Sequence, residues 1–139
     1  MALNIYLDID GVLLANTDNT ANYADDFLKY ALTKYPDSVY WLTTHCQGDA
    51  SVPIQRFGHL FEPKTVALMS RIKPTTWDIA KTEAIDFSKP FRWLDDDLFS
   101  EEMRALQQHD ALESWIEINL AKNENQLLEV IDLLKKMVN

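Results

Sequence analysis

The apolar residues of this chain fall into short segments that predict alternating strands and helices. Four segments consist mainly of apolar, β-branched and aromatic residues, the residue types that favour strands. These segments are residues 3–9, 38–44, 91–94 and 114–118. A further short strand is predicted near residues 65–69, in a region that prolines interrupt.

Helices are predicted between and after these strands. From Ala24 to Tyr35 the apolar residues recur every three or four positions, and Pro36 ends the pattern. Two further helices are predicted over residues 76–86 and 100–108. The C-terminal segment places its apolar residues on one helical face, and these residues are Leu127, Val130, Ile131, Leu134 and Val138.

This alternation indicates an α/β fold with a mainly parallel central sheet and helices on both faces. Residues 1–139 are enough for one core and too few for two, so we expect a single domain. In such sheets ligands bind outside the carboxyl ends of the strands. Asp8, Thr43 and Asp95 each end a predicted strand, so we expect these three residues to meet in one crevice.

Charge and composition argue against some classes of partner. The 22 acidic residues outnumber the 13 basic ones, and the formal net charge of −9 argues against an extended nucleic-acid-binding face. No apolar run reaches the roughly 20 residues of a membrane-spanning helix, so no membrane partner is expected. The single cysteine, Cys46, excludes an internal disulfide, and the N-terminus carries no export signal, so the sequence predicts a cytoplasmic protein.

Acidic residues gather after two of the predicted strands. Asp8 and Asp10 follow the first strand, and Asp95 and Asp96 follow the strand at 91–94. Carboxylates crowded together cannot all stay ionised without a counter-charge. An oxygen-only set suits Mg²⁺, and the three histidines and one cysteine lack zinc-ligand spacing. We therefore expect these four aspartates to form a Mg²⁺ site, whereas Asp97 also suits the start of the following helix.

Four motifs give the chain a resemblance to the haloacid dehalogenase (HAD) superfamily, most of whose members are Mg²⁺-dependent phosphohydrolases. The stretch IYLDIDGV is similar to the first motif, and VYWLTT is similar to the second, a strand that ends in Thr or Ser. Lys81 in DIAKTEAI is the candidate for the third motif, and FRWLDDD is similar to the fourth, a strand that ends in paired acids. The resemblance covers residues 5–97 and implies a HAD-like Rossmannoid fold.

The resemblance implies a role for each acid. Asp8 would be the nucleophile that forms an aspartyl-phosphate, as enzyme carboxylates are known to do. Asp10 would be the general acid and base, and its backbone carbonyl would bind the metal. Asp95 would bind Mg²⁺, and Asp96 would hold it directly or through water. The dehalogenases of the superfamily lack an acid two residues after the nucleophile, so Asp10 indicates phosphatase chemistry.

The resemblance also assigns polar residues around the phosphoryl group. Thr43 would hydrogen-bond a phosphoryl oxygen, and the adjacent Thr44 is the alternative for this role. Lys81 would balance the negative charge of the nucleophile and the phosphoryl group, as fixed positive charges do in phosphoryl transfer. Lys73 and Lys89 compete with Lys81 for this assignment, because the distance from Lys81 to the fourth motif is short for the family.

The substrate-binding residues are less well defined by the sequence. Gly11 would let the chain leave the first strand sharply beneath the substrate. Thr44, His45 and Arg56 follow the second motif and are candidates for contacting the substrate. The segments between the motifs are too short for a full cap domain, so we expect a capless or minimally capped member. Its open crevice would admit a phosphorylated small molecule or macromolecule, or a second copy of the chain would close it in a homo-oligomer.

Two alternatives come from other functional classes. A phosphoacceptor receiver domain also surrounds Mg²⁺ with aspartates, a Thr or Ser and a Lys. In a receiver the lysine comes last along the chain, whereas here Lys81 precedes Asp95. A catalytically inactive HAD-like module would serve binding or assembly, but Asp8 and Asp10 are the first residues that such a module would be free to lose.

Overall fold

A four-stranded parallel sheet forms the centre of the computed structural model, which describes residues 3–137. The strands lie in the order β4, β1, β5, β6, and every pair of neighbours is parallel. Their bounds are β4 Val39–Trp41, β1 Asn4–Leu7, β5 Phe91–Asp95 and β6 Trp115–Glu117. All four residues of the central strand β1 are buried, as its apolar sequence predicts.

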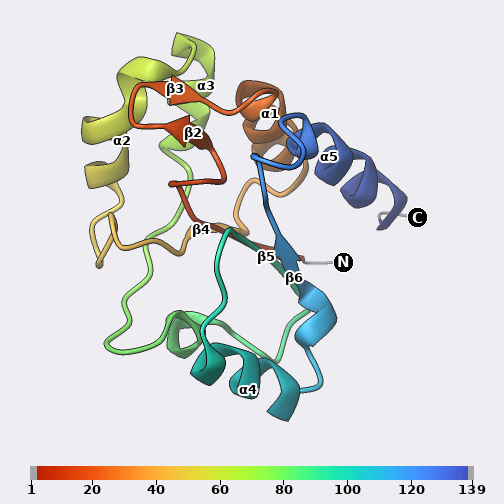
Figure 1. Cartoon of the computed structure of the whole chain (residues 1–139). Coiled ribbons are helices and arrows are strands. Elements are labelled where there is room, and N and C mark those ends of the chain that lie inside the picture. Colours follow the sequence, from red (N-terminus) through yellow and green to blue (C-terminus); the bar gives the residue numbers. More distant parts are fainter. Residues whose placement is uncertain (1–2, 138–139) are drawn as a thin grey trace.

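Helices cover both faces of this sheet (Figure 1). The bounds of the three covering helices are α1 Ala24–Lys34, α4 Ser100–Gln108 and α5 Gln126–Met137. Side chains of β1 alternate between the faces, so Ile5 and Leu7 join the core under α1 and α5, and Tyr6 joins the core under α4. The predicted α/β fold, with its parallel sheet and helices on both faces, is therefore confirmed.

The chain turns tightly directly after β1. The amides of residues 12–14 all donate to the carbonyl of Ile9, at 3.0–3.2 Å. Gly11 lies in this turn with a φ of 76°, which glycine adopts without steric cost. A hairpin that the sequence did not predict follows the turn, and its strands are β2 Leu14–Asn16 and β3 Asn19–Thr20.

The strand predicted near residues 65–69 is wrong, because this segment belongs to helix α3 (Pro63–Met69). Pro63 begins the helix, where its missing amide proton costs no intrahelical hydrogen bond. Thr65 and Met69 are the buried residues of α3, and their spacing of four positions is that of a helix. α3 packs against α1. The elements that precede it are α2 Ser51–Phe57 and the 3₁₀ turn η1 Gly58–Leu60.

The helix predicted over residues 76–86 is also wrong. The helical part of this segment is the 3₁₀ turn η2 (Lys81–Ala84). The carboxylate of Glu83 accepts hydrogen bonds from the amides of residues 78–80 at 2.8–3.1 Å. These amides are therefore bonded by a side chain, and a tight loop leads into Lys81 in place of a helix.

The other predicted elements agree with the structure, whereas α2 and η1 correspond to no predicted element. α4 spans the predicted 100–108, and β6 lies within the predicted 114–118, after the 3₁₀ turn η3 (Leu112–Ser114). Val138, which the sequence places on the apolar face of the last helix, lies outside the described residues. Among residues 3–137, no helix is both long enough and apolar enough to cross a membrane.

Candidate functional site

The register of the sheet brings Asp8 and Asp95 together at one edge. Leu7 of β1 pairs with Leu94 of β5, and the next residue along each chain segment is an aspartate. The amide of Asp8 donates to the carbonyl of Leu94 at 3.1 Å, which continues the ladder by one residue. Both aspartates are buried, with 8% and 2% of their surface exposed. The crevice expected outside the carboxyl ends of the strands therefore contains buried carboxylates.

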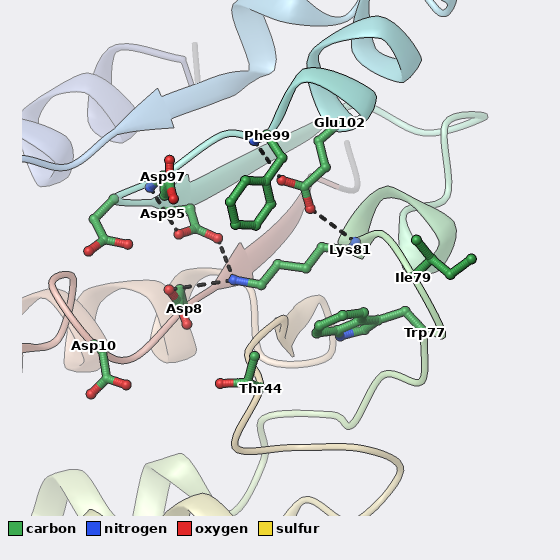
Figure 2. Close-up of a pocket in the computed structure, with 11 residues that line it drawn as sticks. Asp8, Asp10, Thr44, Trp77, Ile79, Lys81, Asp95, Asp97, Phe99 and Glu102 are labelled. Carbon is green, nitrogen blue, oxygen red and sulfur yellow. Dashed lines mark hydrogen bonds and ion pairs between the residues drawn. The ribbon is translucent and has the colours of Figure 1, made fainter.

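Three carboxylates lie close enough to hold one metal ion. Asp8, Asp95 and Asp96 each offer one oxygen, and these oxygens lie within 4.8 Å of one another. The ammonium of Lys81 lies 2.6 Å from Oδ2 of Asp95 and 3.5 Å from Oδ2 of Asp8 (Figure 2). The structure thus places the four residues, drawn from three separate sequence motifs, around one point.

The electrostatics of this group reflect burial and like charge. Burial raises the pKa of Asp95 to about 8, and the neighbouring charge of Asp8 acts in the same direction, while Lys81 offsets part of the shift. Burial by itself lowers the pKa of Lys81, but Asp8 and Asp95 outweigh burial and raise it above its usual value. One ammonium therefore serves two buried carboxylates, and either a proton or a cation must supply the missing positive charge.

Lys81 is anchored by Glu102, a residue that the sequence analysis did not assign to the site. Oε2 of Glu102 accepts the amide of Lys81 at 3.1 Å, and Oε1 accepts the amide of Phe99 at 3.0 Å. The Glu102 side chain is buried, so it ties the first turn of α4 to the loop that carries the lysine. Its one sequence signal was an acid in the first turn of a helix, which is too common to indicate a site.

Gly11 allows the turn after β1 to approach Asp96. A Cβ placed on Gly11 would lie 2.8 Å from Cγ of Asp96, which is closer than real Cβ contacts allow. Any larger residue would therefore displace the Asp96 carboxylate, in addition to straining the positive φ. The sequence assigned Gly11 to the turn beneath the substrate, and the structure adds this contact with a metal-binding candidate.

The two threonines after β4 occupy different places. Thr43 is fully buried, and its hydroxyl oxygen accepts the amide of His45 at 3.3 Å. Thr44 lines the cleft beside Asp8 (Figure 2). The sequence favoured Thr43 as the hydroxyl that binds a phosphoryl oxygen, and the geometry favours the alternative that it left open, Thr44.

Asp10 lies at the rim of the cleft and contacts different partners from Asp8. Its side chain is 63% exposed, and its Oδ2 lies 2.7 Å from Nε2 of His45. The other ring nitrogen of His45, Nδ1, lies 3.0 Å from Nη1 of Arg56 in α2. The three-carboxylate group does not include the Asp10 carboxylate. The predicted metal-binding role of Asp10 thus depends on its backbone carbonyl, and the predicted substrate candidate His45 contacts Asp10.

The cleft has a charged part and an apolar part. It encloses about 210 Å³, and the carboxylates and Lys81 line one part of it. Trp77, Ile79 and Phe99 line the rest, and Figure 2 shows Trp77 and Ile79 on the side away from Asp8. Ile79 and Phe99 are 82% and 61% exposed, which is unusual for large apolar residues. These three apolar residues were not predicted to line a cleft, because Trp77 and Ile79 lie in a loop that the sequence pattern assigned to a helix and Phe99 lies directly before α4.

The three lysines that were candidates for the site lie in different parts of the structure. Lys81 lines the cleft. The backbone of Lys73 bonds to the edge strand β4, and its ammonium lies 5.7 Å from the ring centroid of Tyr40. Lys89 is exposed in the loop before β5. Lys81 is therefore the one of the three that contacts the carboxylates.

Carboxylates that lie beside an ammonium, and that could also hold a metal ion, are suited to nucleophilic attack on a centre that carries negative charge. Comparison of the chain with protein-family models, with curated proteins and with solved structures finds no match. The chemistry of the site is therefore inferred from its own residues and their geometry.

Proposed function

We propose that the protein is a Mg²⁺-dependent phosphomonoester hydrolase of HAD type that acts through an aspartyl-phosphate. The observation that carries the proposal is the meeting of Asp8, Asp95 and Asp96 within 4.8 Å, with the ammonium of Lys81 in contact with two of them. Asp8 and Asp95 are buried, and few structural needs would place them beside each other and a third, exposed carboxylate, because a buried charge costs desolvation energy.

The three carboxylates fit Mg²⁺, which prefers oxygen ligands and is commonly held by one or two carboxylates with water completing the shell. Asp8, Asp95 and Asp96 would hold the ion, and the backbone carbonyl of Asp10 is a further proposed ligand. When bound there, Mg²⁺ would reduce the repulsion between the carboxylates and an anionic phosphoryl group. Two buried carboxylates share one ammonium, and such an ion would balance the remaining negative charge.

Asp8 is the proposed nucleophile. Its carboxylate oxygen forms a bond to phosphorus as the bond between phosphorus and the leaving oxygen breaks, and Asp10 gives a proton to that oxygen. Water then loses a proton to Asp10 and attacks the aspartyl-phosphate, which releases phosphate and restores Asp8. Lys81 stabilises the charge on the phosphoryl oxygens, and the hydroxyl of Thr44 donates a hydrogen bond to one of them.

The apolar residues of the cleft indicate which substrates would suit it. Trp77, Ile79 and Phe99 lie in the same cleft as the proposed nucleophile, and contact with apolar substrate atoms would remove their exposed surface from water. We therefore propose that a phosphoester with an uncharged apolar group beside its phosphate suits this cleft. Aromatic phosphomonoesters are accordingly suitable first substrates.

Turnover of p-nitrophenyl phosphate with Mg²⁺ or with EDTA tests the proposal, with Asp8→Asn as the variant. We expect turnover that requires Mg²⁺ and that Asp8→Asn abolishes, because an amide cannot form the acyl-phosphate. Full activity in EDTA, or in Asp8→Asn, would contradict the mechanism. If neither this compound nor a broad panel of phosphoesters is turned over, the alternative of an inactive binding or assembly module is favoured.

A further inference from the structure

We propose that His45 and Arg56 position Asp10 for proton transfer to the leaving group. This inference rests on the proposed phosphatase function and assigns it two further positioning residues. The inference is drawn from two contacts that His45 makes at once. One ring nitrogen of His45 contacts Arg56, and the other contacts Asp10. From the sequence, His45 and Arg56 were candidates only for contact with a substrate.

The donors and acceptors of this chain of contacts are fixed by chemistry. A guanidinium has only donors, so Nη1 of Arg56 donates to Nδ1 of His45 across 3.0 Å. Nδ1 must therefore carry a lone pair, and the proton of the neutral ring lies on Nε2. Nε2 then donates to Oδ2 of Asp10 across 2.7 Å. Arg56 thus selects the one tautomer of His45 that can hold Asp10.

The imidazole is held in place from several directions. Its ring packs edge-on against Phe57 at a centroid distance of 4.9 Å, and Phe57 follows Arg56 in α2. The backbone amide of His45 donates to the hydroxyl oxygen of Thr43 at 3.3 Å. The His45 side chain is mostly buried, with 19% exposed, whereas the Asp10 side chain that it contacts is largely exposed. His45 is therefore the fixed partner of the pair, and α2 supplies the two side chains that contact its ring, Arg56 and Phe57.

This contact determines which oxygen of Asp10 carries the transferred proton. Because Oδ2 already accepts from His45, the proton that moves lies on Oδ1, and Oδ2 can accept the same hydrogen bond with or without it. In the first step the bond from phosphorus to the leaving oxygen breaks, its electron pair stays on that oxygen, and the oxygen takes the proton from Oδ1 of Asp10. Removing His45 or Arg56 leaves Asp10 free to turn toward solvent, so protonation of the leaving group becomes inefficient.

Two substrates of similar size measure this effect. The nitrophenolate of p-nitrophenyl phosphate leaves with little need of a proton, whereas the alkoxide of benzyl phosphate requires one. The value of kcat/KM reports the steps up to phosphoryl transfer to Asp8, including departure of the leaving group. We expect His45→Leu and Arg56→Met to lose at least about 10-fold more kcat/KM with benzyl phosphate than with p-nitrophenyl phosphate.

A conservative variant and a matched control separate positioning from general damage. The amide of a glutamine at position 45 can donate to Asp10 and accept from Arg56, so His45→Gln should restore most of the benzyl phosphate activity that His45→Leu loses. Arg71→Met, at another exposed arginine, should leave the ratio of the two substrates unchanged. Equal losses on both substrates, or no recovery in His45→Gln, would overturn the inference while leaving the phosphatase function intact.

A spectroscopic measurement tests the same contact without activity. In ¹⁵N NMR spectra of the resting protein at neutral pH, His45 should show the tautomer protonated at Nε2, and Arg56→Met should lose this preference. A His45 ring protonated at Nδ1 in the wild type would overturn the inference. If wild-type protein turns over neither of these phosphoesters nor any of the broad panel, the proposed function fails, and the inference fails with it even if the tautomer is the expected one.

Discussion

The site contains two groups of charged residues that differ in burial. The buried triad comprises Asp8, Asp95 and Lys81, and the rim chain comprises Asp10, His45 and Arg56. In the triad the charges touch each other away from water, and one ammonium faces two carboxylates. In the rim chain the imidazole of His45 separates the guanidinium from a largely exposed carboxylate. The first arrangement leaves negative charge that either a proton or a cation can balance, and the second leaves the Asp10 carboxylate open to solvent.

The difference in burial determines how strongly each group responds to a change in charge. Charges taken out of water pay a desolvation cost, so the triad is sensitive to any change in charge, whether by proton, metal or substitution. Solvent screens an exposed carboxylate, so the rim chain contributes little to stability and acts through orientation. Stability measurements should therefore respond strongly to the triad and weakly to the rim chain.

The largest expected effect is on the pH dependence of stability without metal. In the folded protein Asp95 keeps its proton up to a pKa of about 8, whereas in the unfolded chain the carboxyl loses it near 3.8. Between these values the folded state binds more protons, so the contribution of Asp95 to the free energy of unfolding falls by several kcal/mol as pH rises. Urea unfolding in EDTA at a series of pH values measures this change.

The variant Asp95→Asn isolates this contribution from those of other groups. The asparagine side chain is uncharged at every pH in this range. The variant should therefore become more stable relative to wild type as pH rises from about 4 to about 8. At the higher pH values of this range, Mg²⁺ should stabilise the wild type more than it stabilises the variant. If the wild type instead became more stable relative to Asp95→Asn as the pH rises in EDTA, the raised pKa of Asp95 would be contradicted.

The next largest effect is expected for Lys81→Met. The variant keeps much of the aliphatic chain but removes the charge that faces the phosphoryl group, so kcat should fall by about 10²–10³-fold. Lys89→Met serves as the matched control, because Lys89 is exposed and lies in the loop before β5. Steady-state turnover of p-nitrophenyl phosphate makes the comparison. A loss in Lys89→Met as large as that in Lys81→Met would show that the wrong lysine is assigned.

A smaller effect is expected at the residue that anchors the triad. Glu102→Ala leaves the amides of Lys81 and Phe99 without their acceptors, which should cost about 1–3 kcal/mol of stability. Glu102→Gln keeps one acceptor oxygen and should cost less. Urea unfolding measures both variants at one pH. Equal costs for Ala and Gln would contradict this account, because Gln keeps both the packing of the side chain and one of its two acceptor oxygens.

The smallest effect on stability is expected in the rim chain. Arg56 is exposed, so Arg56→Met should change the free energy of unfolding by less than about 0.5 kcal/mol. Its effect on catalysis should nevertheless depend on the leaving group, as argued for the contact with His45. Unfolding and turnover measured on one preparation test the pair of expectations. A variant that loses stability and activity together would place Arg56 in a structural role.

The sequence predicted the centre of the site because that part follows from local pattern. A buried strand that ends in an aspartate fixes both the element and the position of its last side chain. Once β1 and β5 are neighbours in a parallel sheet, Asp8 and Asp95 must meet at its carboxyl edge. Tertiary contacts were needed to choose between Thr43 and Thr44 and among the three lysines.

The sequence misjudged the segments in which side chains compete with regular structure. Over residues 76–86 the spacing of apolar residues fits a helix, but Glu83 bonds the amides of 78–80 and Ile79 is left exposed. The pairing of Asp10 with His45 depends on where α2 lies, and no short motif encodes that. These are the parts of the site in which the tertiary fold outweighs local preference.

The central claim is that Asp8 of the buried triad becomes phosphorylated during turnover. Asp10→Asn should slow the attack of water on the aspartyl-phosphate, so the intermediate should accumulate when p-nitrophenyl phosphate is the substrate. Mass spectrometry of peptides from acid-quenched Asp10→Asn protein in Mg²⁺ should find one phosphoryl group on Asp8, and Asp8→Asn protein should carry none. Turnover by wild type with the phosphoryl group on a different residue, or on no residue, would contradict the account.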